Sequence, residues 1–179
     1  MKIINSFFSD CYIFTNKRFN DKRGFFTEIY NEKEINSHKR NQQFNCKQIN
    51  FIFSNQNSLR GMHFQKKPFS QKKILRVIEG KIFDVVLDIR KKSKTFGQYR
   101  TFILSEQNKK QIFIGEGFAH GYMTLSKTAK VEYLCSNFYR SDYESCIKWD
   151  DPDINIKWPK DKKFLISPKD EKGIFFSEI

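Results

Sequence analysis

The sequence predicts an all-β fold, an antiparallel sandwich or barrel in which a jelly roll is the favoured arrangement. Its 20 phenylalanines and many β-branched residues favour strands over helices. Short apolar runs are separated by frequent turn residues, and no strand pattern alternates with a helix pattern. The length of 179 residues suits one domain, which we assign to residues 1–179 because no repeat or linker divides the chain.

The first elements are short. Residues 21–24, Asp-Lys-Arg-Gly, predict a turn, since glycine adopts backbone conformations that other residues avoid. A strand is expected over 25–30, followed by a weak, polar helix over 31–44 that serves as a connector or a lid. Residues 46–53 predict a further strand, and residues 54–57, Ser-Asn-Gln-Asn, predict a turn.

The middle of the chain gives the clearest strand patterns. The apolar stretch 58–65 predicts a strand, and 74–78 and 81–89 predict a hairpin around Gly80. Later strands are expected over 99–104, 111–114, 121–125 and 129–138. From residue 150 the chain is irregular, and we expect this tail to wrap over the barrel and bring 166–170 to a site at its mouth.

The formal net charge of +13 has two explanations: a nucleic-acid surface, or lysines spread over a solvated surface around a local anion site. The lysines occur in short, scattered groups, such as Lys66-Lys67, Lys91-Lys92 and Lys109-Lys110. Such scatter is typical of rims and turns rather than of one basic stripe. We therefore expect no nucleic-acid partner.

The cysteines indicate a reducing compartment. Cys11, Cys46, Cys135 and Cys146 fall at no spacing typical of metal ligands or redox pairs. Polar residues interrupt any secretory signal, and no window approaches the roughly 20 apolar residues of a membrane helix. We expect a cytoplasmic protein with reduced thiols and no membrane partner.

The stretch 58–65 also carries the first candidate for chemistry. It places His63 close to Arg60, and a titratable imidazole beside a fixed cation suits proton chemistry on an anionic substrate. A core histidine bonded to the backbone explains the stretch equally well on its own. His120 lies in a similar glycine-flanked setting, and small barrels bind ligands through inward-facing side chains near the mouth.

A metal centre is the main rival explanation for histidines in a jelly-roll barrel. Such a centre needs a His-x-His pair with a carboxylate and a further histidine, because a divalent ion takes three or four converging ligands. The residue two positions after His63 is Gln65, a poor ligand. We therefore expect no metal.

Several short motifs together carry a resemblance that extends over nearly the whole chain. They are residues 21–28, 48–50, 59–65, 71–73, 117–121, 131–133 with Tyr139, 149–152 and 167–170. In this order and spacing the chain resembles the dTDP-4-dehydrorhamnose 3,5-epimerase family of nucleotide-sugar enzymes. The resemblance implies a cupin-like jelly-roll barrel with short flanking helices, an irregular C-terminal tail, no cofactor and a homodimer.

The resemblance also implies a reaction and its catalytic residues. Family members invert carbons 3 and 5 of a 4-keto sugar, and each of these carbons is acidic because it lies next to the ketone. His63 matches the base, Asp170 the carboxylate that orients it, and Tyr133 the acid on the opposite face. Lys73 matches a cation beside the developing oxyanion. Without the resemblance, Tyr133 is better explained as a barrel-lining aromatic and Lys73 as a solvated lysine.

Further positions match substrate contacts of the family. They are Arg23, Phe26, Glu28, Gln48, Asn50, Arg60, His120, Tyr139, Glu144 and Lys169. Arginine suits the diphosphate because its planar guanidinium forks onto phosphate oxygens, and the Tyr139 match is an aromatic that stacks on the nucleobase. In the family some of these contacts come from the partner subunit.

Departures from the family pattern leave alternatives open. Ile52 and Asn57 stand where a serine and a glycine are common, close to the nucleotide, so a GDP-linked or heptose substrate is an alternative. An epimerase of one carbon alone shares the same scaffold. More distant alternatives are a ketoisomerase of the same sugars, a basic nucleic-acid-binding barrel and a sugar-binding module without turnover.

Overall fold

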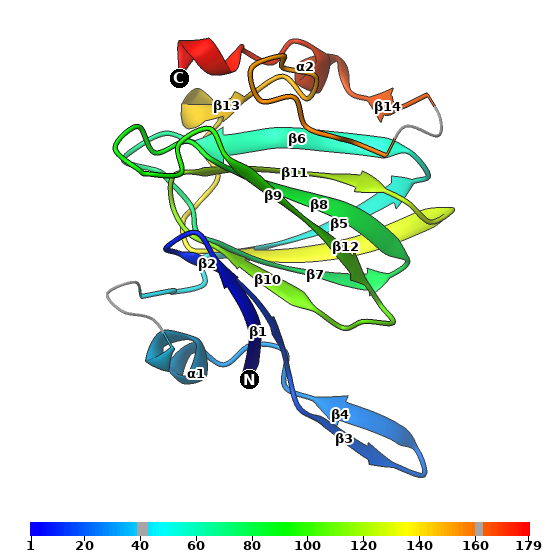
Figure 1. Ribbon diagram of the computed structural model, residues 1–179. Coiled ribbons are helices and arrows are strands. Elements are labelled where there is room, and N and C mark those ends of the chain that lie inside the picture. Colours follow the sequence, from blue (N-terminus) through cyan, green and yellow to red (C-terminus); the bar gives the residue numbers. More distant parts are fainter. Residues whose placement is uncertain (39–42, 160–162) are drawn as a thin grey trace.

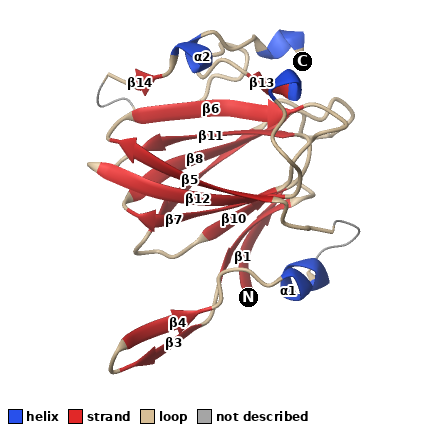
Figure 2. Ribbon diagram, turned by 180° about the vertical axis from the view of Figure 1, so that it is seen from behind, coloured by secondary structure: helices blue, strands red, loops and turns tan. Residues whose placement is uncertain are grey.

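The computed structural model describes residues 1–38, 43–159 and 163–179, and within them it shows two facing sheets with a hairpin that projects from the body (Figures 1 and 2). The first sheet has the strand order β1-β2-β10-β7-β12-β5. Its strands are β1 (Lys2–Phe7), β2 (Cys11–Thr15), β10 (Gln111–Ile114), β7 (Lys73–Glu79), β12 (Thr128–Cys135) and β5 (Gln48–Asn55). All of its neighbouring strands are antiparallel.

The second sheet has the order β13-β6-β11-β8-β9, and β14 adds to β6 as its one parallel neighbour among the described strands. Its strands are β13 (Glu144–Cys146), β6 (Ser58–Gln65), β11 (Phe118–Thr124), β8 (Lys81–Asp88), β9 (Tyr99–Ser105) and β14 (Leu165–Ile166). Strands β3 (Arg18–Asp21) and β4 (Gly24–Thr27) form the projecting hairpin. The predicted all-β jelly roll is confirmed.

The main core lies between the sheets. Ile13 and Leu75 of the first sheet share one apolar cluster with Val86, Leu104 and other residues of the second. These side chains are buried, and each contributes about 1.5–3 kcal/mol relative to an exposed position. Because successive side chains of a strand point to opposite faces of its sheet, the outer face of each sheet has to be covered by a further element.

The C-terminal tail covers the outer face of the second sheet (Figure 1). Ile154, Ile156 and Trp158 pack with Leu59 and Met62 of β6 in a second apolar cluster. Beyond them lie α2 (Pro168–Glu171) and the 3₁₀ turn η2 (Phe176–Glu178). The prediction that the tail wraps over the barrel is therefore confirmed. Because the tail packs on the outer side of β6, this strand is buried on both faces.

Helix α1 (Glu32–Ser37) lies against the first sheet, with Ile35 in a third cluster beside Phe14 and Phe113. It starts where the Asn31 side chain accepts a hydrogen bond from the Glu34 amide. The predicted helix over 31–44 is too long, and residues 39–42 of it lie outside the described part. The other short helical turn, η1 (Ser141–Tyr143), precedes β13.

Several other predicted boundaries were wrong. The strand expected over 25–30 ends at Thr27, because the backbone carbonyls of residues 28 and 29 bind the Asn16 side-chain amide instead of a strand partner. Strand β5 continues to Asn55, into the predicted 54–57 turn. Strand β12 ends at Cys135 rather than at residue 138. Strand β13 was not predicted, because its three residues are too few to show an alternation of apolar and polar side chains.

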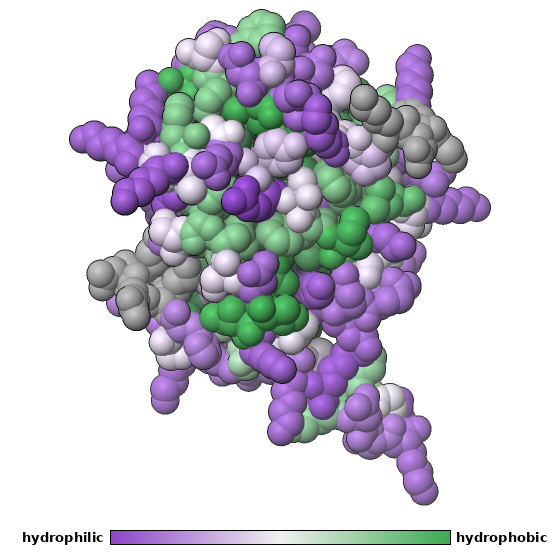
Figure 3. All heavy atoms as spheres, viewed as in Figure 1, coloured by the Kyte–Doolittle hydropathy of each residue, from purple (hydrophilic) through white to green (hydrophobic). Residues whose placement is uncertain are grey.

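The surface agrees with the scattered lysines of the sequence. On the face seen in Figure 3, hydrophilic side chains project from many points of the outline and along the hairpin. Among the described residues, no helix has the length and apolar character needed to cross a membrane.

Candidate active site

Two adjoining cavities lie between the sheets. The first, of about 180 Å³, is lined by Ile52, Arg60, His63, Lys73, Leu75, His120, Gly121, Tyr122, Tyr133 and Glu144. The second, of about 90 Å³, is lined by Gln48, Asn50, His63, Phe64, Gln65, Gln71, Lys73, Tyr133, Tyr139 and Glu144. Four residues line both: His63, Lys73, Tyr133 and Glu144. We call the two together the paired cavity.

Two glycines allow β6 and β11 to approach closely beside this cavity. A Cβ on Gly61 would lie 2.5 Å from the Gly121 Cα, and one on Gly121 would lie 2.6 Å from the Arg60 carbonyl oxygen. Gly61 also has a φ of +115°, a conformation that other residues rarely adopt. The glycine-flanked histidines of the sequence thus become His63 and His120, paired across the two strands.

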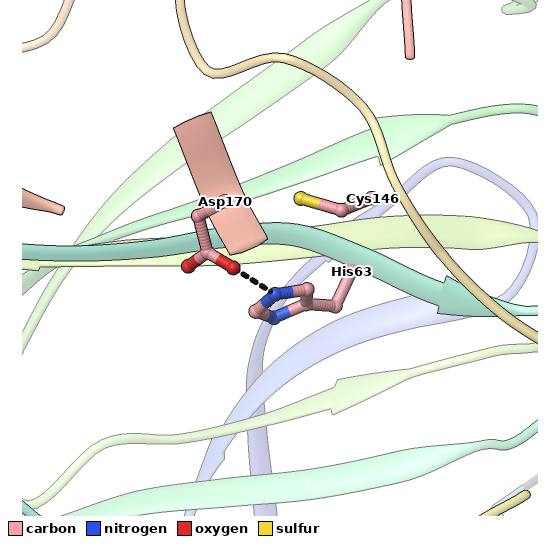
Figure 4. A group of neighbouring side chains, drawn as sticks. All are labelled: His63, Cys146 and Asp170. Carbon is pink, nitrogen blue, oxygen red and sulfur yellow. Dashed lines mark hydrogen bonds and ion pairs between the residues drawn. The ribbon is translucent and has the colours of Figure 1, made fainter. Parts of the chain in front are cut away.

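His63 is held by a buried carboxylate (Figure 4). Its Nε2 lies 2.8 Å from Asp170 Oδ1, and the other carboxylate oxygen accepts a hydrogen bond from the Gly61 amide. Burial alone would raise the pKa of Asp170, but the hydrogen bonds and the charge of His63 lower it below its usual value. The His63 side chain is partly exposed. Because Nε2 is paired with Asp170, Nδ1 is the ring nitrogen that remains to accept a proton.

The tail positions Asp170. Ser167 caps α2 by accepting a hydrogen bond from the Asp170 amide, and Pro168 occupies the first turn, where no amide hydrogen is needed. The helix therefore begins at a fixed point behind β6. The prediction that 166–170 reaches the site is confirmed in position.

Tyr133 and Lys73 come from the neighbouring strands β12 and β7. The Lys73 ammonium lies 6.0 Å from the centre of the Tyr133 ring. Burial raises the pKa of Tyr133 to about 12, so its phenol stays protonated, and burial lowers the pKa of Lys73 below its usual value. The cavity thus brings together a base, a proton donor and a cation.

A second histidine–carboxylate pair lies deeper. His120 Nε2 is 2.8 Å from Asp84 Oδ2, and both side chains are buried. Asp84 was not predicted from the sequence as a site residue. A carboxylate in the apolar run 82–87 is itself an indication, because a buried acid needs a partner.

The rim of the paired cavity is polar. The Tyr139 hydroxyl donates to Glu144 at 2.7 Å, and Lys169 forms an ion pair with the same carboxylate. Burial would raise the pKa of Glu144, but the hydrogen bonds from Lys169 and Tyr139 lower it. Gln48 donates to Asn50 and accepts from the backbone amide of residue 139. These predicted contact residues therefore lie together in one chain.

Three predicted contact residues lie elsewhere. Arg23 and Phe26 belong to the hairpin that projects from the body in Figure 1, and Glu28 follows it. None of the three lines the paired cavity. The Arg23 side chain is 91% exposed, and its ion pair is with Asp21 of the same hairpin. Phe26 is 67% exposed.

Cys146 is a neighbour of the site that was not predicted from the sequence. It lies opposite His63 in the β13–β6 pairing, and its thiol is close to the His63–Asp170 pair (Figure 4). Burial, together with the charges of Asp170 and Glu144, raises the pKa of this thiol to about 12. The position of Cys146 in the sequence gave no indication of this contact, because the pairing of β13 with β6 and the course of the C-terminal tail bring the three residues together.

Comparisons with known proteins agree with this geometry. The family model described as dTDP-4-dehydrorhamnose 3,5-epimerase matches residues 6–178. A Shigella flexneri protein of that name is 42% identical over 97% of this chain and 94% of its own length. An Escherichia coli protein of the same name is 37% identical over 100% of this chain and 96% of its own.

Solved structures are also similar. A dTDP-6-deoxy-D-glucose-3,5-epimerase from Legionella pneumophila, in complex with dTDP-4-keto-L-rhamnose, has a TM-score of 0.94 and is 37% identical. The similarity covers 99% of this chain and 94% of that one. A dTDP-4-dehydrorhamnose 3,5-epimerase from Elizabethkingia anophelis has a TM-score of 0.93 at 37% identity, over 99% of this chain and 97% of that one.

Proposed function

This chain belongs to the dTDP-4-dehydrorhamnose 3,5-epimerase family, and we propose that it inverts carbons 3 and 5 of a dTDP-linked 4-keto-6-deoxyhexose. It is an isomerase. The observation that carries the catalytic assignment is that His63 and Tyr133 line the same paired cavity, with Lys73 beside them. The sugar ring occupies that cavity, so that one of its faces meets the imidazole and the other meets the phenol.

His63 begins each inversion. Its Nδ1 removes the proton from the carbon next to the ketone, and the electron pair of that bond moves onto the carbonyl oxygen to give an enolate. Asp170 fixes the ring through Nε2 and stabilises the imidazolium that forms. A buried carboxylate with a lowered pKa suits this part, because it stays ionised.

Tyr133 completes the inversion by protonating the carbon from the opposite face. A phenol with a pKa of about 12 holds its proton at neutral pH, and the enolate carbon is basic enough to accept it. The proton then returns to Tyr133 from solvent, and the proton on His63 is lost to solvent. A second round at the other carbon uses the same residues.

Lys73 stabilises the enolate oxygen. A fixed cation aimed at the developing charge in a site that excludes water contributes on the order of 3 kcal/mol. His120, held by Asp84, also lines the cavity and helps to position this part of the sugar. No cofactor is needed for this chemistry, because the ketone itself makes the neighbouring protons acidic.

The remaining residues of the paired cavity hold the nucleotide and the diphosphate. Arg60 supplies charge for the phosphates, Gln48 and Asn50 supply amide groups, and Tyr139 supplies an aromatic face for the base. Glu144 and Lys169 fix one another at the rim.

We further propose a homodimer in which Arg23, Phe26 and Glu28 serve the partner's cavity. The hairpin that carries the first two extends away from its own site, with Phe26 exposed (Figure 2). Strand β5, at the edge of the first sheet, exposes a second apolar strip of Ile49, Phe51 and Phe53. Contiguous exposed apolar side chains on an edge strand are typical of a surface that pairs with another chain.

The dTDP nucleotide is favoured over GDP because the relatives and neighbours named above carry dTDP in their names. Inversion of one carbon alone is the second candidate, because a 3'-monoepimerase from Streptomyces bikiniensis has a TM-score of 0.88 at 27% identity. The enzyme acts in the cytoplasm, where we expect its nucleotide-sugar substrate.

The test is to incubate the enzyme with dTDP- and GDP-linked 4-keto-6-deoxy sugars in heavy water and to follow the products by NMR. Inversion with deuterium at carbons 3 and 5 of the dTDP sugar is the expected result. Exchange at one carbon would assign a single-centre epimerase, and a displaced carbonyl would assign a ketoisomerase. Exchange at neither carbon would reject the proposal, and a steep salt dependence of DNA or RNA binding would then favour the basic barrel.

A further inference from the structure

Cys146 adds a third kind of metal ligand to the His63–Asp170 pair. One ring nitrogen of His63, Sγ of Cys146 and one oxygen of Asp170 all lie within 4.8 Å of one another (Figure 4). The three residues come from separate segments: His63 from β6, Cys146 from β13 and Asp170 from α2. Imidazole, thiolate and carboxylate are the ligands that zinc prefers in proteins.

We propose that His63, Cys146 and Asp170 bind a thiophilic divalent cation, with zinc as the best fit, and that this binding inhibits the enzyme. Around a tetrahedral zinc ion, ligand atoms at about 2.0–2.3 Å from the metal are separated by roughly 3.3–3.8 Å. The longest separation in this group is at most 4.8 Å, so the ligand atoms have to approach by at most about 1 Å. The fourth position is left for water.

Little hydrogen bonding is lost when the Cys146 thiol binds a metal ion. Cys146 Sγ makes one hydrogen bond, to the backbone carbonyl of Ile147 at 3.5 Å, and a thiol is a weak donor. Cys146 is almost fully buried, so its thiolate forms only when a cation compensates the charge.

Zinc at this point stops the proposed proton transfer. Coordination through Nε2 replaces the hydrogen bond to Asp170 and leaves the ring proton on Nδ1, the nitrogen that has to accept the substrate proton. Coordination through Nδ1 occupies the same lone pair directly. Either geometry disables the base, so the ion is an inhibitor rather than a cofactor. This consequence rests on the proposed function, whereas metal binding itself does not.

The first test compares zinc inhibition of the wild type with that of Cys146→Ala and Cys11→Ala. Cys146 has no part in the proposed mechanism, so its alanine variant retains basal activity. Loss of one of three ligands is expected to raise the zinc concentration for half inhibition ~10-fold or more. Cys11 is a buried cysteine of the main core, and its variant should match the wild type. Magnesium, which prefers oxygen ligands, should not inhibit, and the chelator EDTA should restore activity.

Equal zinc sensitivity of the wild type and Cys146→Ala would overturn the proposal, as would a wild type that zinc does not inhibit. The second test needs neither turnover nor a folded variant. Cobalt(II) added to the wild type should give one equivalent of a near-ultraviolet thiolate-to-cobalt absorption, and zinc should displace it. Absence of that absorption would reject the site, even if the protein proves inactive as an epimerase.

Discussion

Asp170 uses both of its carboxylate oxygens, one for His63 and the other for the Gly61 amide. Asp170→Asn keeps the shape of the side chain but cannot offer two acceptors and a negative charge. We expect kcat to fall by ~10²–10⁴-fold with little change in KM, because the imidazolium loses its stabilising partner and the ring its fixed tautomer. Steady-state kinetics on the dTDP-4-keto sugar measure this.

The matched control for that variant is Glu171→Gln, an exposed carboxylate on the same helix. It should retain wild-type kcat. A loss of less than about threefold in Asp170→Asn would remove this carboxylate from the mechanism, since general acid–base groups are worth at least ~10²-fold.

The alkaline limit of activity should come from Lys73. Burial lowers its pKa below 10.5, so its charge is lost as the pH rises through that lowered value, and the enolate oxygen then loses its cation. Tyr133, with a pKa of about 12, remains protonated over the same range. The pH dependence of kcat should therefore fall with an apparent pKa below that ordinary lysine value.

Lys73→Arg provides the check on this assignment. Arginine stays charged at all accessible pH values, so the alkaline fall in this variant should move to higher pH even if its maximal rate is lower. An unchanged alkaline limb in Lys73→Arg would assign the fall to another group.

The residues of the site differ in how far the sequence could predict them. His63 and Arg60 stand out by type and spacing, whereas the assignments of Tyr133 and Lys73 needed the family resemblance, because neither residue differs locally from an ordinary strand residue. Asp84 was missed although its apolar surroundings indicate a buried acid. Cys146 had no local indication, since the contact depends on strand pairing 83 residues from His63 in the chain.

The close approach of β6 and β11 sets the position of both histidines. Gly121→Ala should lower the free energy of unfolding by about 1–3 kcal/mol, because the new Cβ meets the Arg60 carbonyl at 2.6 Å and the Met62 sulfur at 2.8 Å. Activity should fall as well, since His63 and His120 lie on the displaced strands. Urea unfolding gives the free energy.

Gly24→Ala is the control for this effect. Gly24 has a φ of +136°, but a Cβ at this position would meet no atom within 4 Å, so only backbone strain, about 1 kcal/mol, is added. If Gly121→Ala were no more destabilising than Gly24→Ala, the close strand approach would not be the reason for the glycine.

The presence of a helix or strand was more predictable from the sequence than the residues at which it begins and ends. The strands with long alternation or long apolar runs, such as β7 and β8, cover nearly the residues that the pattern predicted. The predicted hairpin between them was wrong, because β7 and β8 belong to different sheets. The end of β4 depends on hydrogen bonds that the Asn16 side-chain amide donates, and the start of α1 depends on a hydrogen bond that the Asn31 side chain accepts. A hydrophobic pattern reports neither. Asn57 has a φ of +61°, a left-handed conformation that glycine and asparagine adopt more readily than other residues.

The proposed dimer predicts complementation between inactive subunits. Arg23→Ala and His63→Asn should each give a poorly active homodimer. In a mixed dimer, the subunit with intact His63 receives intact Arg23 from the other subunit, so one working site forms. Co-expression of the two variants, with activity measured on the purified mixed dimer, should therefore restore inversion.

The control pair is His63→Asn with Tyr133→Phe. These residues line the same cavity of one chain, so every site in the mixed dimer lacks one of them and activity should stay lost. If co-expression of Arg23→Ala and His63→Asn did not restore activity, the hairpin residues would not serve the partner's cavity. The sequence alone could not predict this arrangement, because a single chain does not record which residues serve a neighbour.

The central claim is that a base and an acid act on opposite faces of one sugar ring in the paired cavity. Its most direct test is Tyr133→Phe with the dTDP-4-keto sugar in heavy water, followed by proton NMR. We expect deuterium still to enter next to the ketone, because His63 still removes and returns the proton on its own face, while inversion falls by ~10²-fold or more. Inversion at the wild-type rate would contradict the account, as would loss of both exchange and inversion in a correctly folded variant.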